Sequence, residues 1–197
     1  MPGFPHLWIE RYRPASRTLA IPVVLALVVD VSSKSAANMA ELLWSCYWAS
    51  ALIAFGLIID CGLLVSAGFI FQAAVGGPGW TLGLIYRHDA QLPSVLLHVV
   101  PPLTGLLYVF GMPEIPKAAT AIGWLVHPVS FLASLLWRND DLNVNFSSAV
   151  WPPLAGMFPL LVFQAYLMAT SLLLVLGTSN LIDRLLRSRN ALQRGDW

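Results

Sequence analysis

The sequence predicts an all-α integral membrane protein, a bundle of six transmembrane helices with both termini in the cytoplasm. Hydrophobic residues make up 57% of the 197-residue chain and charged residues only 11%, whereas soluble domains carry about 25% charged residues. The mean hydropathy is +0.71. This composition excludes a cytosolic enzyme, a disulfide-stapled secreted domain and a disordered tail. A net charge of +1 without a large basic patch excludes nucleic acid as a partner.

Six apolar segments account for the predicted helices, in a single membrane domain that covers residues 1–197. A membrane-spanning helix needs about 20 mostly apolar residues, because each residue adds about 1.5 Å along the helix axis. Segments of this kind lie at residues 19–31, 42–59, 63–75, 93–110, 118–137 and 154–177. The first and the third are short, so we expect them to tilt little or to thin the bilayer locally.

The connections between these segments are set by turn-forming residues. Only residues 60–62 (Asp-Cys-Gly) separate the second segment from the third, which predicts a tight helical hairpin. Residues 76–79 (Gly-Gly-Pro-Gly) are expected to open an external loop, because proline ends helices and stiffens turns. Residues 151–153 (Trp-Pro-Pro) are expected to close the loop before the sixth segment. Within the second segment, Ser45 with Ala49 and Ser50 with Ala54 would allow neighbouring helices to approach closely.

The basic residues favour an even number of spans. With six spans, eight of the eleven lysines and arginines lie on the side of the termini: Arg11, Arg13, Arg17, Lys117, Arg184, Arg187, Arg189 and Arg194. The other side holds Lys34, Arg87 and Arg138. Positive charge is retained in the cytoplasm, so we expect a multi-pass protein of a bacterial inner (plasma) membrane. A signal peptide within residues 1–37 is the alternative, because cleavage there would leave five spans and the same charge map.

Two chemically reactive residues are predicted to share one layer of the membrane. Cys46 lies four residues into the second segment, about 6 Å deep, and His98 lies five residues into the fourth, about 7.5 Å deep. An imidazole can take the proton of a thiol, and the resulting thiolate is a nucleophile. Asn143 and Asp141 lie just above this layer, where either could orient the imidazole or complete an oxyanion site.

Each of these residues also has a structural interpretation. A free cysteine is often a small buried hydrophobic residue, and this applies to both Cys46 and Cys61. These two cysteines are predicted to lie at opposite faces of the membrane and so cannot form a disulfide. His127 lies in the middle of the fifth segment, where we expect its ring to hydrogen-bond to Gln164 or Ser130.

No cofactor is predicted from sequence motifs. The chain has no Cys-x-x-Cys, His-x-x-x-His or Glu-x-x-His spacing, which are the patterns typical of metal sites. A single histidine, either His98 or His127, could still ligate a pigment or a haem. Their predicted depths differ by about 7 Å, which is unsuitable for one haem held by both.

The order of several short motifs resembles a known group of membrane proteins. The second segment reads Glu-Leu-Leu-Trp-Ser-Cys-Tyr-Trp-Ala-Ser-Ala-Leu over residues 41–52; His98, Asn-Val-Asn at 143–145 and Gly-Met-Phe-Pro at 156–159 follow. This order resembles the bacterial YwaF-type integral membrane proteins and, more remotely, the androgen-induced family of intramembrane lipid hydrolases. The wider group places a nucleophile on the second helix and a histidine on the fourth. The resemblance therefore implies acyl cleavage or transfer with Cys46 and His98.

Three functions follow as hypotheses. The first is an intramembrane hydrolase or transferase that acts on a lipid ester or thioester through Cys46 and His98. The alternative is a non-catalytic accessory subunit of a larger membrane complex, which packs against partner proteins and holds a pigment or lipid through His98 or His127. The third is a small transporter, since short spans are typical of broken-helix carriers. Membrane lipids are the expected partners in the first case, and larger subunits in the second.

Overall fold

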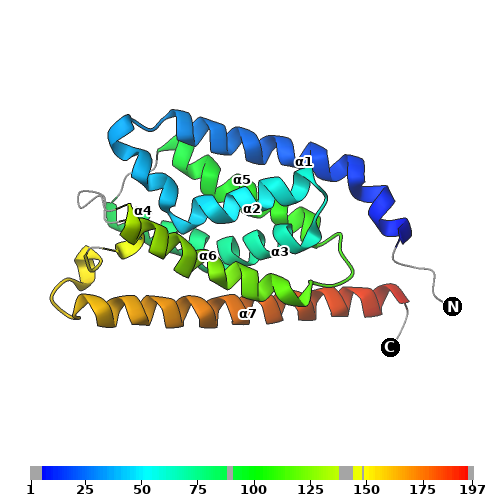
Figure 1. Cartoon of the computed structure of the whole chain (residues 1–197). Helices are drawn as coiled ribbons and strands as arrows, with labels where there is room; N and C mark the ends of the chain where they lie inside the picture. The colour runs from blue at the N-terminus through cyan, green and yellow to red at the C-terminus, as the bar shows by residue number, and fades with distance from the viewer. Residues whose placement is uncertain (1–5, 88–90, 138–143, 148, 195–197) are drawn as a thin grey trace.

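The computed structural model describes residues 6–87, 91–137, 144–147 and 149–194, and its regular elements in these ranges are all helices. The long helices lie side by side in a bundle (Figure 1). They are α1 (His6–Ser32), α2 (Ser45–Ile58), α3 (Gly62–Phe71), α4 (Gly77–Arg87), α5 (Leu92–Val109), α6 (Lys117–Leu136) and α7 (Leu160–Arg194). Shorter helices join them: η1 (Ala36–Leu43), η2 (Gln72–Gly76), η3 (Val144–Phe146) and η4 (Pro152–Leu154).

The chain passes along the bundle in alternating directions, and α1 begins at the same end at which α7 finishes (Figure 1). We call this end the termini end and the opposite end, where η1 joins α1 to α2, the η1 end. Five helical stretches are long and apolar enough to cross a membrane: Ala15–Ser32, Gly62–Tyr86, Leu92–Val109, Lys117–Leu136 and Leu160–Gln193. The predicted second span is shorter, because α2 has 14 residues, or about 21 Å against a hydrocarbon core of about 30 Å.

The prediction of a loop at residues 76–79 is wrong, because these residues are helical. They belong to one continuous helical stretch, which we call the third pass. α3, η2 and α4 follow one another without a break from Gly62 to Arg87. η2 is a π-helix, and the Gly77 N–H closes its wider turn on the Gln72 carbonyl. Pro78 is the second residue of α4, and because it lacks an N–H it cannot donate the helical hydrogen bond to the preceding turn. The change of hydrogen-bond pattern lets the chain carry this proline without ending the helix.

The sixth predicted segment, 154–177, is displaced along the chain. α7 begins at Leu160, directly after Pro159, and the two prolines at 152–153 belong to the short helix η4. α7 then continues to Arg194, far beyond the predicted apolar segment. Charged residues mark where a helix leaves the apolar layer, but they do not end the helix. Asp183 and Arg187 form an ion pair of 2.6 Å at the i, i+4 spacing that supports a helix.

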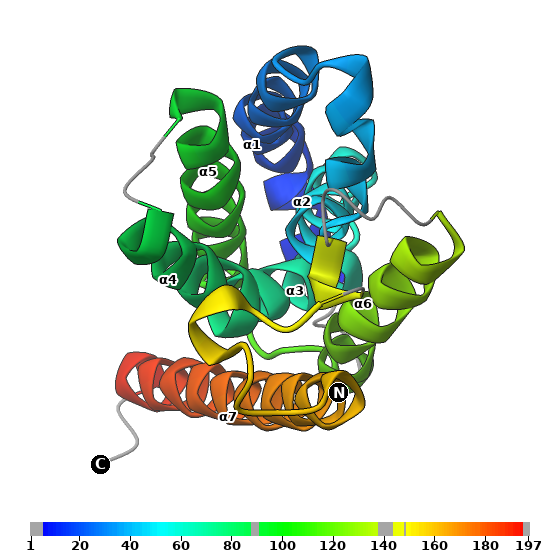
Figure 2. The same cartoon turned by 90° about the vertical axis from the view of Figure 1, so that its left-hand side faces the viewer.

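Small residues allow the central helix α2 to pack closely on its neighbours. Figure 2, which views the η1 end, shows α2 between α1, α3, α5 and α6. Ala49, Ser50 and Ala54 are buried, as the predicted close approach requires. A side chain at Gly68 of α3 would collide with the Ala49 carbonyl oxygen, and one at Gly123 of α6 would lie 2.8 Å from a backbone oxygen of α3.

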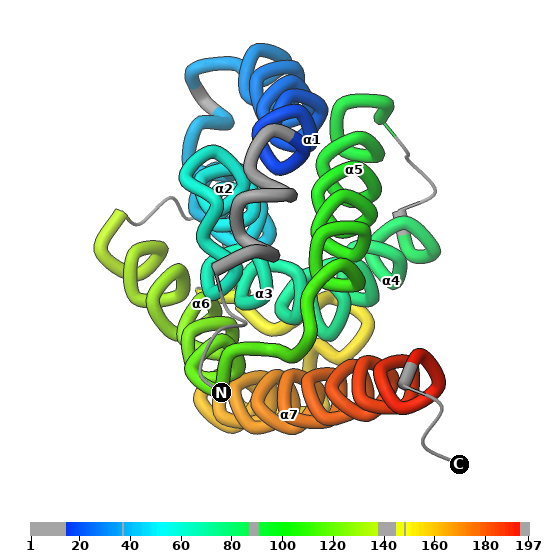
Figure 3. Tube along the Cα trace, turned by 90° about the vertical axis from the view of Figure 1, so that its right-hand side faces the viewer, coloured from blue at the N-terminus to red at the C-terminus, as the bar shows by residue number. Residues whose placement is uncertain are grey.

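At the termini end, α7 holds the connection between α5 and α6 (Figure 3). The Arg189 guanidinium donates hydrogen bonds to the carbonyl oxygens of Phe110 and of Met112, the latter at 2.8 Å. The Asn190 side-chain amide donates to the Pro113 carbonyl at 2.7 Å. A cation suits this place because the last carbonyls of α5 carry the negative end of the helix dipole.

Candidate functional site

Charged and polar residues gather at the η1 end of the bundle. The Lys34 ammonium lies 2.6 Å from a carboxylate oxygen of Glu41 and 3.7 Å from one of Asp30. The Asp30 side chain is only 1% exposed. Cys46, at the start of α2, and His98, in the first two turns of α5, belong to the same end of the bundle. We call this group the polar cluster: Asp30, Lys34, Glu41, Cys46, Gln72 and His98.

Cys46 is held against the π-turn of the third pass. It is the second residue of α2 and is half-buried. The Gln72 amide nitrogen donates hydrogen bonds to the Cys46 carbonyl at 2.9 Å and to the Ser50 hydroxyl at 2.8 Å. A Cβ built at Gly76 would lie 3.8 Å from the Cys46 Cβ and would collide with the Gln72 side-chain oxygen. The absence of a side chain at Gly76 therefore allows Gln72 to reach α2.

His98 on α5 has a fixed ring orientation and a fixed tautomer. Its Nδ1 lies 2.8 Å from the Ser94 carbonyl oxygen. A carbonyl can only accept, so Nδ1 carries the hydrogen and the neutral ring presents a lone pair at Nε2. The ring stacks on Trp80 of α4, with centroids 4.8 Å apart and planes 7° apart. The Trp80 indole N–H donates to the Ser94 hydroxyl at 2.9 Å, which ties α4 to α5.

Cys46 and His98 lie against the same face of the third pass. Cys46 is beside Gly76, and His98 stacks on Trp80. These two contact residues are four positions apart, the spacing that puts residues on one side of a helix, and are separated by about one turn, or 5.4 Å. Within the described residues, no hydrogen bond joins the Cys46 thiol to the His98 ring.

This arrangement can support nucleophilic chemistry. A half-buried thiol reacts faster with a base that takes its proton, because the neutral thiol is a poor nucleophile. The lone pair of His98 Nε2 is a candidate base whose orientation the structure fixes. Hydrogen bonds used in catalysis are often long in resting enzymes and shorten when substrate binds. Cys46 lies in the first turn of α2, where the positive end of the helix dipole favours negative charge.

The two predicted assisting residues, Asp141 and Asn143, lie outside the described residues. Asn145, two positions further on, is instead the centre of a buried network. Its side-chain oxygen accepts from the Ser45 N–H at 3.1 Å and from the Ser45 hydroxyl at 2.9 Å. Its amide nitrogen donates to the Leu43 carbonyl and the Ser134 hydroxyl, both at 2.8 Å. Asn145 thus caps α2 from 100 residues away, a link that no local sequence pattern reveals.

The predicted partners of the His127 ring are wrong. Gln164 donates to two backbone carbonyls in the segment after α6, and the Ser130 hydroxyl donates to the His127 backbone carbonyl at 3.0 Å. The His127 ring meets Phe71 edge-on at a centroid distance of 6.4 Å. Its Nδ1 is buried and has no hydrogen-bond partner among the described residues. The same residues contain no group of three or more His, Cys, Asp or Glu placed to hold a metal ion.

The chain matches no family model, no curated protein and no solved structure. The resemblance to the YwaF-type proteins and the androgen-induced lipid hydrolases therefore remains a prediction from short motifs. The function has to be argued from the polar cluster itself.

Replacing Gly76 with alanine is expected to displace the Gln72 amide and to lower the free energy of unfolding by about 1–3 kcal/mol, because buried hydrogen bonds to α2 are lost. The matched control is Gly83→Ala in α4, where a Cβ would meet nothing within 4 Å. The measurement is reversible unfolding of both variants in detergent micelles. Equal stabilities for the two variants would show that Gln72 does not depend on the absence of a side chain at Gly76.

Proposed function

We propose that this chain is a six-span membrane protein that hydrolyses or transfers an acyl group of a lipid ester or thioester. Cys46 would be the nucleophile and His98 the general base. The observation that carries this proposal is the orientation of His98. Its Nδ1–H is bonded to a carbonyl, which leaves the Nε2 lone pair free, and its contact residue Trp80 lies about one helical turn from Gly76, the residue beside Cys46.

The proposed reaction has two steps. In the first, the Cys46 sulfur attacks the acyl carbonyl and its proton passes to His98 Nε2, which then protonates the departing alcohol or thiol. In the second, water or an acceptor hydroxyl loses its proton to His98 and attacks the acyl-thioester, which releases the product and restores the thiol. The positive end of the α2 dipole would help to stabilise the developing oxyanion.

The proposed topology places the termini end in the cytoplasm and the η1 end on the external side of a bacterial inner membrane. The excess of lysine and arginine at the termini end supports this orientation. The sixth crossing would be made by α2 together with η1, which extends the short helix toward the surface. A lipid would then reach the polar cluster from the external leaflet.

The test is covalent labelling of Cys46 in intact membranes with a lipid-like acylating probe, located by mass spectrometry. We expect Cys46 to react faster than Cys61, and its rate to fall about 100-fold in His98→Ala, a typical effect of losing a general base. His127→Ala is the matched control and should leave the rate unchanged. Cys46→Ala should lose the adduct and the turnover while remaining folded.

A Cys46 rate that is slow and indifferent to His98 would overturn the proposed function. Full turnover of lipid ester by Cys46→Ala would do the same. Both outcomes are judged on variants whose helix content, measured by circular dichroism, equals that of the wild type.

A second candidate function is an accessory subunit that holds a pigment or haem through His98. The observation in its favour is the Nδ1–H bond to the Ser94 carbonyl, the arrangement typical of a histidine that ligates a metal through Nε2. This candidate predicts a visible absorption band and larger partner proteins in fixed ratio when the chain is purified from its native membrane. Transport has less support, because the polar cluster lies at one end of the bundle and carriers bind substrate near the midplane.

A further inference from the structure

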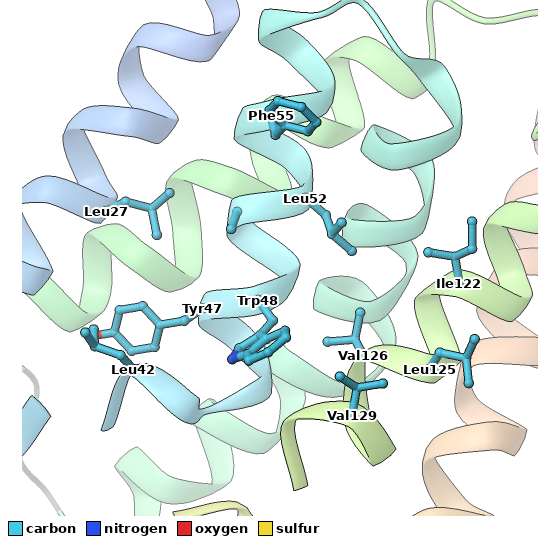
Figure 4. Close-up of a pocket in the computed structure, with 11 residues that line it drawn as sticks. Leu27, Leu42, Tyr47, Trp48, Leu52, Phe55, Ile122, Leu125, Val126 and Val129 are labelled. Atoms are coloured by element: carbon cyan, nitrogen blue, oxygen red, sulfur yellow. The ribbon is translucent and has the colours of Figure 1, made fainter. Parts of the chain in front are cut away.

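Two outward-facing features of the bundle are not used by the proposed reaction. One is an apolar groove of about 600 Å³ between α1, α2 and α6, lined by side chains such as Leu52 and Phe55 (Figure 4). The described residues that line this groove carry no charge, so the groove does not select one class of ligand. The other feature is the outer side of α7 near the termini end, where exposed arginine and leucine side chains lie together. Its charge gives this second feature a recognisable partner.

The contact between α6 and α7 gives the depth of this part of α7. The hydroxyl oxygens of Thr120 and Ser179 are 2.6 Å apart. The apolar span of α6 begins at Lys117, three residues or about 4.5 Å from Thr120 toward the termini end. α7 runs in the opposite direction, and Arg184 lies five residues or about 7.5 Å beyond Ser179 toward the same end. Arg184 is therefore about 3 Å outside the apolar span of α6, within the headgroup layer, which extends about 5–8 Å beyond the hydrocarbon core.

Arg184 points away from the bundle. Ile182 and Leu186 on the same helix are buried, and Arg184 lies two positions, or about 200° of rotation, from each of them. α7 itself lies at the edge of the bundle (Figures 2 and 3). Leu181 and Leu185, on either side of Arg184 in the sequence, are 59% and 47% exposed. The outer side of α7 thus presents two apolar side chains and a guanidinium group to the membrane at headgroup depth.

The charge of Arg184 is not neutralised by the part of the chain that the structure describes. Its side chain is exposed, and it forms no ion pair with a described residue. Arg187, one turn further along, differs because a carboxylate oxygen of Asp183 lies 2.6 Å from its guanidinium. An arginine at the boundary of the apolar layer needs an anion nearby, and its planar guanidinium matches the oxygen atoms of a phosphate group. Arg184 therefore lacks the kind of partner that Arg187 has.

We infer that the outer side of α7 binds an anionic phospholipid, whose phosphate accepts hydrogen bonds from the Arg184 guanidinium while its acyl chains cover Leu181 and Leu185. The aliphatic part of an arginine side chain can lie along apolar neighbours while its charged end reaches the headgroups. The hydrogen bonds of Arg189 and Asn190 to the α5–α6 connection hold this end of α7 against the bundle. The site lies at the opposite end of the bundle from the polar cluster, so it is independent of the proposed reaction.

The test is a lipid titration of the purified protein in detergent micelles, followed by native mass spectrometry. The two probes are phosphatidylglycerol and phosphatidylcholine with identical acyl chains, so that they differ only in the headgroup. We expect wild type to bind the first phosphatidylglycerol about fivefold more tightly than phosphatidylcholine, the ratio that corresponds to one basic residue at an anionic surface. Arg184→Gln should lose this preference, and Arg184→Lys, which keeps the charge, should retain most of it.

Arg187→Gln is the matched control, because it removes the same charge from the same helix, but from a side chain that Asp183 already neutralises. This variant should retain the preference for phosphatidylglycerol. Equal affinity of wild type for the two lipids would overturn the inference. An equal loss of preference in Arg184→Gln and Arg187→Gln would also overturn it, because the net charge of this end of the bundle would then be responsible. Displacement of the lipid by excess inorganic phosphate would overturn it in favour of a free anion.

Discussion

Asn145→Leu is expected to lower the free energy of unfolding by about 3–5 kcal/mol, because four buried hydrogen bonds at about 1 kcal/mol each are removed and their partners are left unpaired. The Asn145 side chain is 3% exposed, and its partners come from the start of α2, from the last residue of η1 and from α6. Leucine has nearly the same shape, so the loss has two sources, the missing hydrogen bonds and the backbone conformation. Asn145 also has a φ of 52°, a conformation that asparagine tolerates better than leucine.

Asn145→Asp is the informative companion of this variant. It keeps the oxygen that accepts from Ser45 but loses the amide nitrogen that donates to Leu43 and Ser134. Its stability should therefore fall between those of wild type and Asn145→Leu at a pH where the carboxyl is neutral. The measurement is chemical unfolding in detergent micelles. A leucine variant as stable as wild type would contradict the role of Asn145 as the cap of α2.

Gly68→Leu is expected to prevent α3 from packing against α2. A Cβ at this position would collide with the Ala49 carbonyl oxygen and lie 2.8 Å from the Ile53 side chain. Backbone atoms cannot move aside as a side chain can, so we expect a loss of more than about 3 kcal/mol, the upper end for overpacked cores.

The control for this variant is Gly177→Leu on α7, an exposed position where a Cβ would meet nothing within 4 Å. Leucine is a better helix former than glycine by about 0.8 kcal/mol, so this control should be as stable as wild type or slightly more stable. The yield of folded protein in size-exclusion chromatography and the unfolding midpoint distinguish the two. A normal yield and midpoint for Gly68→Leu would contradict the close approach of the helices.

The sequence predicts the uniform helices well and the irregular one poorly. The segments 93–110 and 118–137 match α5 and α6 within one residue, because long apolar runs bounded by polar residues or proline have one simple solution. Residues 76–79 contain three glycines and a proline, which locally favour a loop. They are helical because the π-turn redirects the hydrogen bonds and the Gln72 amide is held by α2.

The candidate site was likewise predictable only in part from the sequence. Counting residues from the membrane surface placed Cys46 and His98 at similar depths, and both lie toward the η1 end. A residue count along each segment gives depth but not the rotation of the helix about its axis. That rotation decides that Cys46 and His98 both face the third pass. Gln72 and Asn145 cannot be recognised as site residues from the sequence, because their hydrogen-bond partners lie 26 and 100 positions away and leave no periodic pattern.

The π-turn at Gln72–Gly76 also sets the direction, around the helix axis, in which the side chains of α4 point. Such a turn accommodates one more residue than an α-helical turn, and one residue corresponds to about 100° of rotation. A regular α-helix through the same residues would turn Trp80 about 100° away from His98. Deletion of one residue from this stretch would instead remove the extra residue of the π-turn, so the helix would become regular while Trp80 still faced His98. The stacking of His98 on Trp80 thus depends on a match between the length of this segment and its hydrogen-bond pattern.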